Sequence, residues 1–374
     1  MNTHETQESQ KEYRPEFSLS AEGKDITKAI QQSLIELRLT DNGGATAKTD
    51  ELQITLQGET LPLPPKGARL KVALGFNGAL QDKGWFVVNG VGSSGPPRKL
   101  VVYATAAPMN SEKQIGNVQS HKTRSWNAVT LGDIVKTVAS EHGLKPRITA
   151  KLSGILISHL DQIAESDANL LTRLARTYNA VSKPSGGYWL FLEQGQAASA
   201  SGKALAEIEL KPSDVSNWSY SEGQRGAASA SSSGDSKKEQ GKIGVAYYDE
   251  QTGQTRLLTQ ESHGPDISNA FTQPEKSQAA QQAVAKKTQV NRNQQRMNLS
   301  GPCRPWHLPL TAEARIITQG FGDREDRRWL IESMIYQLSA QGMTVDFSLA
   351  VDLKPASSKG KKKDEKPKGP DYFG

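Results

Sequence analysis

Three carboxylates that lie close together in the sequence could support acid–base or metal chemistry. Asp161, Glu165 and Asp167 stand directly before an apolar pattern typical of a helix, in the stretch DQIAESDANLLTRLA. Paired carboxylates can exchange protons or bind a divalent cation. However, Ser166 or Asp167 would also cap this helix, and acidic side chains are favoured near the positive end of a helix dipole. We expect helix capping here, with an acid–base or metal site as the alternative.

Cysteine and histidine form no pattern typical of catalysis or of zinc binding. The single cysteine, Cys303, lies near His307 and could form a Cys–His nucleophile with it, but a buried or incidental thiol is the expectation. His142 precedes Gly143 and fits the C-terminal end of a helix. The six histidines, which lack the spacing of zinc ligands, are His4, His121, His142, His159, His263 and His307. We therefore predict no catalytic residue, no metal ligand and no cofactor.

Two other stretches could suggest nucleotide or DNA binding. Gly320-x-Gly322 lacks the third glycine and the following helix of a phosphate-binding loop, so we interpret it as a turn. The stretch TLGDIVKTVASEHGL could pass for the first helix of a helix-turn-helix motif, but no basic recognition helix follows Pro146. Both stretches are better explained as structure.

The positive charge is concentrated in one segment. The chain of 374 residues has a net charge of +6 and a pI of about 9.1, a balance that could indicate nucleic-acid binding. Residues 354–374 hold seven lysines against three acidic residues, so they contribute +4 and leave about +2 for the rest. We predict a disordered basic tail, solvated or docked on a partner, and a nearly neutral body.

The apolar content excludes a membrane-spanning chain. Hydrophobic residues make up 35% of the sequence, mean hydropathy is −0.60, and no apolar run approaches the roughly 20 residues that cross a bilayer. The first residues, MNTHETQESQ, lack the apolar core of a secretion signal. With one cysteine, an intrachain disulfide is impossible. These features predict a protein of two or three small domains that is not tied to a membrane.

The periodicity of apolar residues divides the chain into segments. Between Phe17 and Ala107 apolar residues alternate with polar ones, which predicts five or six strands with one buried face. From Thr130 the period becomes helical, with Thr130 and Asp133 as a cap, and a second helix and a Gly-aromatic strand follow. Strands return after residue 204, and Met343 to Leu353 alternates most regularly.

The fold class that we predict is α+β, mainly β. Its segments are a first tube-like β-barrel at 12–108, a linker at 109–128, a small α+β module at 129–194, and a second tube-like β-barrel at 204–353. The second barrel would contain a flexible insert at 226–242 and a polar helix at 273–297, and the basic tail would follow at 354–374.

A repeated stretch supports two related β modules. ARLKVALGFNGALQDKGW, Ala68 to Trp85, is similar to ARIITQGFGDREDRRW, Ala314 to Trp329. The matched landmarks are Ala68 with Ala314, Arg69 with Arg315, Gly75 with Gly320, Phe76 with Phe321, and Trp85 with Trp329. We interpret each copy as a strand, a tight Gly-Phe turn, a charged tip and a returning strand that begins at Trp. Three chains with two modules each would present six similar modules around one axis.

Several stretches resemble the phage late control D family of contractile-tail baseplate hub proteins, which is related to the N-terminal part of type VI secretion spike proteins. They are YRPEFSLSAEGKDIT, HLDQIAESDANLLTRLARTYNAVSKPSGGYWLF and RRWLIESMIYQLSAQGMTVDFSLAV. The likeness covers about residues 12–353. The residues after Val351 do not resemble the OB-fold and needle of those spike proteins, which implies that the spike is a separate protein.

The resemblance implies a homotrimer that adapts the six-fold inner tail tube to a three-fold spike in the virion baseplate. The partners would be the tail-tube, spike, tape-measure and other baseplate proteins, with assembly in the host cytoplasm. An axial channel would pass DNA without specific binding. The alternatives are a tail-associated peptidoglycan hydrolase and a nucleic-acid-binding regulator of late genes.

Overall fold

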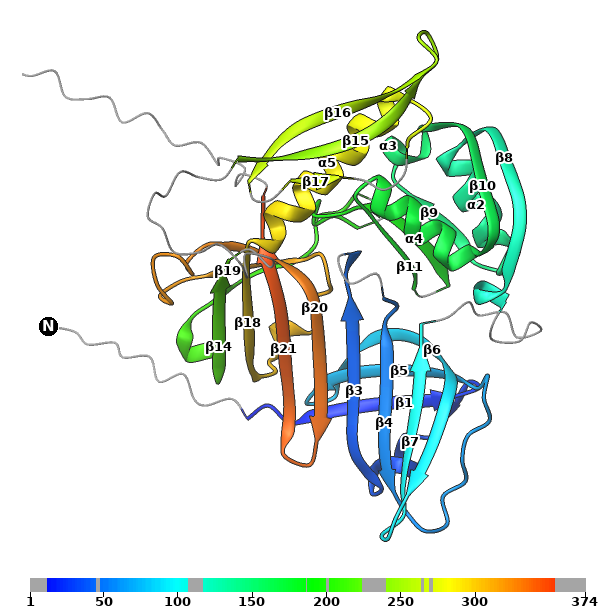
Figure 1. Ribbon diagram of the computed structural model, residues 1–374. Helices are drawn as coiled ribbons and strands as arrows, with labels where there is room; N and C mark the ends of the chain where they lie inside the picture. Colours follow the sequence, from blue (N-terminus) through cyan, green and yellow to red (C-terminus); the bar gives the residue numbers. More distant parts are fainter. Residues whose placement is uncertain are drawn as a thin grey trace, which may run out of the picture.

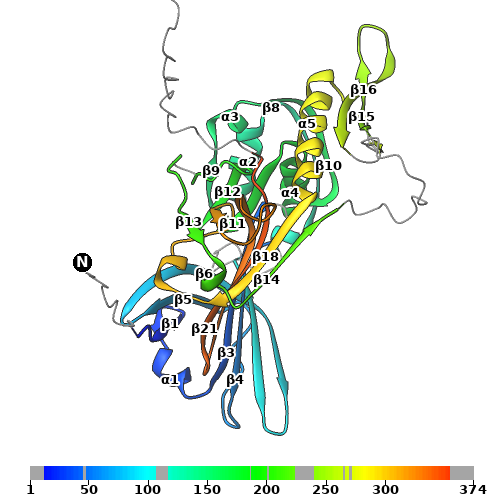
Figure 2. The same ribbon diagram turned by 90° about the vertical axis from the view of Figure 1, so that its left-hand side faces the viewer.

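The computed structural model describes residues 12–44, 48–106, 117–185, 187–199, 202–223, 240–263, 266–268 and 272–353. Most of the described chain is β-structure, with five α-helices (Figure 1). A long row of strands forms one part of the molecule, and a helix-containing part lies at one end of those strands (Figures 1 and 2). None of the described helices is long and apolar enough to cross a bilayer.

Thirteen strands form one continuous sheet. The first half of the chain supplies β1 (Pro15–Ala21), β2 (Lys24–Asp25), β3 (Leu34–Asn42), β4 (Glu51–Gln57), β5 (Arg69–Phe76), β6 (Ala79–Ser94) and β7 (Lys99–Thr105), with helix α1 (Thr27–Gln31) between β2 and β3. The second half supplies β13 (Glu207–Leu210), β14 (Asn217–Glu222), β18 (Gln295–Pro302), β19 (Arg315–Thr318), β20 (Arg328–Ser339) and β21 (Gly342–Val351). The strand order is β14-β18-β21-β20-β3-β4-β7-β6-β5-β1-β2, and β13 adds to β19 beside β20.

The two halves of the sheet have matching strand orders. In the first half β5-β6-β7-β4-β3 are neighbours in that order, and in the second half β19-β20-β21-β18-β14 are. The register also shifts at the same relative place, between Val88 and Gly90 in β6 and between Ile331 and Ser333 in β20. The outer strands differ, because β1 pairs with β5 antiparallel whereas β13 pairs with β19 in parallel.

The middle of the chain forms a separate α+β unit. It contains β8 (His121–Thr130), α2 (Leu131–Glu141), β9 (Lys145–Ile148), α3 (Ala150–Ser153), β10 (Leu156–Ser166), α4 (Asp167–Thr177), β11 (Ala180–Ser185) and β12 (Tyr188–Glu193). Thr130 and Asp133 form a capping box at α2, as the sequence predicts. The unit has its own core, built around Leu131, Ile134, Leu170 and Phe191.

A smaller unit is inserted between the neighbouring strands β14 and β18. It consists of β15 (Gln240–Asp249), β16 (Gln254–His263), β17 (Ile267–Ser268) and α5 (Lys276–Asn293). Ile243, Val245 and Tyr247 of β15 pack against Ala279 and Ala283 of α5. The buried face of α5 presents only alanine as an apolar residue type. A helix of otherwise polar residues can therefore still pack on the hairpin of β15 and β16.

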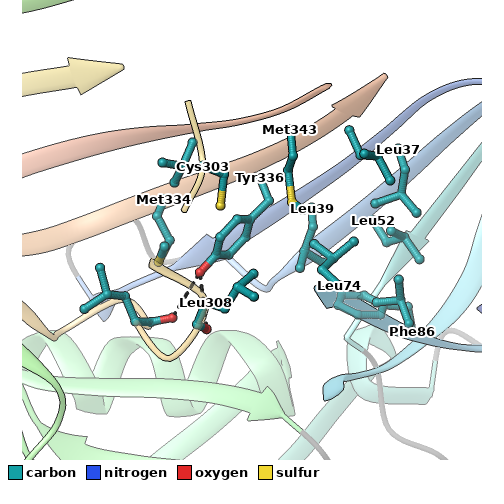
Figure 3. Close-up of a cluster of buried hydrophobic side chains, with 14 of the residues drawn as sticks. Leu37, Leu39, Leu52, Leu74, Phe86, Cys303, Leu308, Met334, Tyr336 and Met343 are labelled. Atoms are coloured by element: carbon teal, nitrogen blue, oxygen red, sulfur yellow. Dashed lines mark hydrogen bonds between the residues drawn. The ribbon is translucent and has the colours of Figure 1, made fainter. Parts of the chain in front are cut away.

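One hydrophobic core runs through both halves of the large sheet. It continues from Leu37 and Leu39 of β3 across to Tyr336 of β20 and Met343 of β21 (Figure 3). Each residue named here is no more than 5% exposed. Burial of these alternating residues fixes the register, since a shift by one residue would turn the apolar side chains outward.

The expected linker differs from the structure, whereas the expected insert and tail lie mostly or wholly outside the described residues. The linker expected at 109–128 contains most of β8, a strand that pairs with β10 in a two-stranded ribbon. Such a ribbon is largely exposed, so β8 lacks the apolar alternation that reveals a buried strand. The expected insert at 226–242 falls mostly outside the described residues, and its last residues begin β15; the tail at 354–374 lies wholly outside them.

The repeat also differs in detail. Gly75 and Phe76 lie within β5, and the turn is formed by Asn77 and Gly78, whose φ angles are 51° and 82°. Gly320 and Phe321 do lie in the loop after β19, where Asp326 accepts hydrogen bonds from both backbone N–H groups. In the sheet register Trp329 faces Ile316 and Phe86 faces Leu70, so Phe86, not Trp85, holds the position of Trp329.

The described strands leave both expected barrels open. Each half continues into the other through the antiparallel pair of β20 with β3, in place of closing on itself. The coarse prediction of a mainly β, α+β fold agrees with the structure, whereas closed tube-like barrels are not seen in the described chain.

Trp329 should contribute far more to stability than Trp85. Trp329 is 0% exposed, and its indole Nε1 donates to Thr318 Oγ1 at 2.9 Å. We expect Trp329→Ala to lower the free energy of unfolding by about 3–5 kcal/mol. The matched control Trp85→Ala removes a half-buried ring and should cost roughly 1 kcal/mol. Urea unfolding followed by circular dichroism measures both; equal losses would contradict the assigned register.

Candidate assembly site at the module junction

A buried lysine joins the α+β unit to the large sheet. Lys183 of β11 has a side chain only 12% exposed, and its Nζ lies 2.8 Å from Asp41 Oδ1 and 2.9 Å from Asp50 Oδ1. The same Nζ donates to Asn42 O at 2.8 Å. Burial lowers the pKa of Lys183, but the two carboxylates outweigh burial and raise it above the usual value. Charged Lys183 therefore links the α+β unit to the large sheet through buried ion pairs.

Asp41 also bonds to the second half of the sheet. Its Oδ2 accepts a hydrogen bond from the Ala312 N–H at 2.9 Å, while its Oδ1 accepts one from Lys183. Burial raises the pKa of Asp41, but Lys183 and the Ala312 bond lower it further, so this carboxyl stays ionised. Asp41, in the first half of the sheet, thus contacts both the second half and the α+β unit at one point.

Asp50, which shares Lys183 with Asp41, has a raised pKa. Burial raises the pKa of this carboxyl, and the charge of Asp41 adds to that rise, whereas Lys183 opposes it; the result is a pKa of about 6. Two carboxylates that share one buried cation repel each other, so one of the pair binds a proton more readily than an isolated carboxyl would.

Glu313 makes a second buried link between the units. Its Oε1 accepts a hydrogen bond from the Gly44 N–H at 2.9 Å, and its Oε2 accepts one from the Gly195 N–H at 2.8 Å. Gly44 follows β3 and Gly195 follows β12, whereas Glu313 precedes β19. Burial raises the pKa of Glu313 in spite of these bonds.

Lys83, near the start of β6, reaches across the junction of the two halves. Lys83 Nζ donates to Leu308 O at 2.6 Å and to the Tyr336 hydroxyl at 3.2 Å. Burial lowers the pKa of Lys83 to about 8. Tyr336 points toward the same loop, and its hydroxyl donates to His307 O at 2.8 Å (Figure 3). Lys83 therefore fastens one half of the sheet onto the other.

Among the strand edges that stay open in the described chain, those of β14 and β6 are the counterparts of edges that pair with each other inside the chain. β14 pairs only with β18, so its outer edge is open, and no described strand covers the edge of β6 from Gly90 to Ser94 opposite β7. These edges lie at opposite ends of the strand row (Figure 1). Trp218 on β14 is 40% exposed although its ring packs edge-on against Phe321, with centroids 5.5 Å apart. Open backbone edges are sites for pairing with another strand.

The acidic stretch expected to cap a helix does more than that. Ser166 caps α4, as one of the two alternatives predicts, by accepting a hydrogen bond from Asn169 N. Asp167 is 0% exposed and accepts bonds from Lys122 at 2.5 Å, Arg124 at 2.8 Å and His142 Nε2 at 2.8 Å. Burial raises the pKa of Asp167, but these bonds lower it well below its usual range.

The sequence could not reveal this network. Lys122 and Arg124 belong to β8, which shows no apolar alternation, and His142 is brought to Asp167 only by the packing of α2 against α4. Asp161 and Glu165 bond elsewhere, to Ser125 and to Arg173. Among the described residues, no group of three or more histidine, cysteine or acidic side chains is placed to hold a metal ion.

Cys303 and His307 do not form a nucleophilic pair. His307 Nδ1 accepts a hydrogen bond from Arg304 N at 3.1 Å, and burial lowers its pKa to about 4. Burial raises the pKa of the Cys303 thiol to about 12, so the reactive thiolate is disfavoured. The buried-thiol interpretation therefore fits the geometry. His4 and the side chain of His263 lie outside the described residues.

Removal of Lys183 should strongly destabilise the junction. Lys183→Met leaves two buried carboxylates without their cation, which should cost about 3–5 kcal/mol of unfolding free energy. The matched control is Lys151→Met, since Lys151 pairs with Glu193 but has a side chain 78% exposed; about 0–1 kcal/mol is expected there. Denaturant titration compares the two, and similar losses would contradict a buried, structural role for Lys183.

Acidification should stabilise the protein through Asp50. A carboxyl with a pKa of about 6 when folded, against its usual 3.8, binds more protons in the folded chain between about pH 4 and 6. Stability from this group therefore rises as the pH falls from 7 to 4. In Asp50→Asn this gain should be absent, as measured by the difference in unfolding free energy between pH 7 and pH 5. Identical pH dependence of parent and variant would refute the assignment.

Solved structures with a similar fold come from phage tails and a secretion system. A 43 kDa tail protein of prophage MuSo2 from Shewanella oneidensis aligns over 90% of this chain and 98% of its own, with a TM-score of 0.62 and 13% identity. A tail protein from Neisseria meningitidis aligns over 91% and 97%, with a TM-score of 0.65 and 11% identity. The E. coli c3393 protein, a component of the type VI secretion system described as structurally similar to the T4 tail proteins gp27 and gp5, aligns over 88% and 76%, with a TM-score of 0.54 and 10% identity.

Sequence comparison gives closer relatives. The probable baseplate hub proteins of Escherichia phages P2 and 186 are 35% and 34% identical to this chain over 214 residues, which is 57% of this chain. The chain spans about half of the length of these relatives, 54% in each. A family model described as phage tail baseplate hub (GPD) matches residues 118–342. This match covers more than half of the chain, which therefore belongs to the phage tail baseplate hub family.

Proposed function

We propose that this chain is a structural subunit of a phage tail baseplate, where three copies form a closed ring. The observation that carries the proposal is that β6 and β14 leave open the edges whose counterparts in the other half, on β20 and β3, pair with each other inside the chain. Family membership and the relatives named as baseplate hub proteins support a structural role in the tail.

The matching strand orders predict which strands meet between subunits. Inside the chain, β20 pairs with β3. The strand equivalent to β20 is β6, and the strand equivalent to β3 is β14, because the order β5-β6-β7-β4-β3 matches β19-β20-β21-β18-β14. In a ring of like contacts, the open edge of β6 therefore pairs with β14 of the next subunit. Three chains linked in this way alternate internal and external junctions around one axis.

The equivalence also fixes the register of the external pair. Inside the chain Tyr336 faces Leu39, Gln337 faces Arg38 and Leu338 faces Leu37. The strand pairs β6–β7 and β20–β21 occupy equivalent positions in the two halves, as do β3–β4 and β14–β18. Placing these equivalent pairs in the same register identifies the residues of β6 and β14 that correspond to the residues of the internal junction. The expected external pairs are Ser93 with Tyr220, Ser94 with Ser219, and Gly95 with Trp218.

Side-chain sizes suit this register. The internal junction sets Tyr336 and Leu338 of β20 against two leucines of β3. At the external junction Ser93 of β6 and Gly95, which directly follows β6, are small, whereas Tyr220 and Trp218 of β14 are large. Aromatic rings from β14 would therefore fill the space that β20 fills internally. Their burial and the pairing of two open edges both favour assembly.

The ring gives a physical meaning to the two related modules. Each half of the sheet would act as one module of a tube-like barrel that closes only in the trimer, so three chains present six similar modules to a six-fold tail tube and a three-fold face to the spike. The axial channel would pass DNA or tape-measure protein. Other baseplate proteins would bind the outside, and assembly would take place in the host cytoplasm before the subunit enters the virion.

Disulfide trapping tests both the ring and its register. The variant Ser94→Cys/Ser219→Cys places one cysteine on each exposed edge, while native Cys303 is buried. Mild oxidation of the assembled protein should give covalent dimers and trimers on a non-reducing gel, and mass photometry should give three chains.

Two controls make the trapping experiment specific. The variant Ser94→Cys/Ser221→Cys moves the second cysteine two residues along β14, where the Cα–Cα separation in the expected register exceeds the roughly 4.4–6.8 Å that a disulfide spans. Each single cysteine variant should give no crosslink. A monomer in solution with tail-tube and spike proteins present, or equal trapping at 219 and 221, would overturn the proposed ring.

A further inference from the structure

A polar cavity of about 710 Å³ lies between α4 and α5. The two helices run near each other (Figure 2), and the floor is completed by residues of β15 and β18 and by Glu332 of β20. Its volume falls in the range of small-molecule sites, roughly 300–1,000 Å³. The barrels and sheet edges of the proposed ring make no use of this cavity.

The cavity wall is strongly cationic. Five basic side chains line it against one acidic side chain, Glu332. They are Arg173, Arg176, Lys286, Arg292 and Arg296. Arg173 is paired with Glu165, and Arg296 lies 3.6 Å from Glu332. For Arg176 and Lys286, both exposed at the rim, the described part of the chain supplies no salt-bridge partner within 4.0 Å.

Arg292 is a buried cation with unused hydrogen-bonding capacity. The residue is 7% exposed, and its Nε has no hydrogen-bond partner in the described chain. One terminal nitrogen donates to Gln194 O, but the distance is long, 3.4 Å. Burial lowers the pKa of Arg292, and Glu313, Glu332 and Asp352 act against that shift. A buried N–H donor without a partner is costly, and a bound acceptor would satisfy it.

We propose that this cavity binds a multivalent oxyanion. A guanidinium presents a planar set of donors that matches carboxylate and phosphate oxygens, and Arg292 would hold one anionic group at the floor. Arg176 and Lys286 would contact further anionic groups at the rim, so a ligand with several charges fits better than a single small ion. Amide side chains of Asn179 and Gln289 line the same wall and can donate to anionic oxygens.

Glu332 makes this binding sensitive to pH. Burial raises the pKa of Glu332, and the nearby charge of Glu313 adds to the rise, whereas Arg296 and Arg292 oppose it. An ionised Glu332 competes with the ligand for these arginines. Its protonation on acidification removes that competition, so the affinity for an oxyanion should increase as the pH falls toward the raised pKa of Glu332.

Calorimetric titration of the full chain tests the proposal. Sodium tripolyphosphate and citrate are titrated separately at constant ionic strength, which distinguishes phosphate from carboxylate as the source of the oxyanion. Saturable binding of either at one site per chain supports the proposal. Both ligands also gain protons as the pH falls, so the role of Glu332 is tested by comparing the parent with Glu332→Gln: the ratio of affinities at pH 6 and pH 8 should be higher in the parent. Chloride at matched ionic strength should give no binding heat.

Rim variants locate the site without disturbing the buried arginine. Arg176→Gln and Lys286→Gln should each weaken binding about tenfold, the loss expected from one charge-assisted contact. The matched control Lys145→Gln removes an exposed lysine of β9 outside the cavity and should leave affinity unchanged. The absence of saturable binding for both anions, or equal affinity in the rim variants and the control, would overturn the proposal.

Discussion

The antiparallel pairing of β20 with β3 is the contact on which the architecture depends. It converts two halves with matching strand orders into a single sheet, and it lets one hydrophobic core continue from Leu37 to Met343. Polar links then hold the third unit against this seam. Lys183 and Asp41 act at one point and Glu313 at another, so a few buried charges determine how the α+β unit sits on the sheet.

Much of the large sheet could be predicted from the sequence because its strands bury one face. Leu52, Ile54 and Leu56 alternate with polar residues, and β4 forms where this pattern predicts a strand. The same reasoning missed β8 and β16, whose exposed ribbons need no apolar alternation. The repeat drew attention to the two hairpins, but it misplaced the first turn, because Asn77-Gly78 provides the positive φ angles there.

The charged junction could not be predicted, and the reason is physical. Asp41, Asp50, Lys183 and Glu313 are far apart in sequence, and each looks like an ordinary surface residue when only its neighbours are considered. Burial depends on how distant strands pack, which no local pattern encodes. The same holds for His142 and Asp167: one ends a helix and one begins a helix, and only the packing of the two helices makes them partners.

The insert between β14 and β18 leaves and re-enters the sheet at neighbouring strands. Gly223 N donates to Gln294 O at 3.1 Å, so the two ends of this long excursion are closed against each other by a backbone bond. Viewed from the sheet, everything between them is equivalent to an enlarged hairpin loop. Such a unit can grow, shrink or be exchanged in evolution while the strand order stays the same. A scaffold of this kind can keep the geometry of its large sheet constant while the inserted unit diverges.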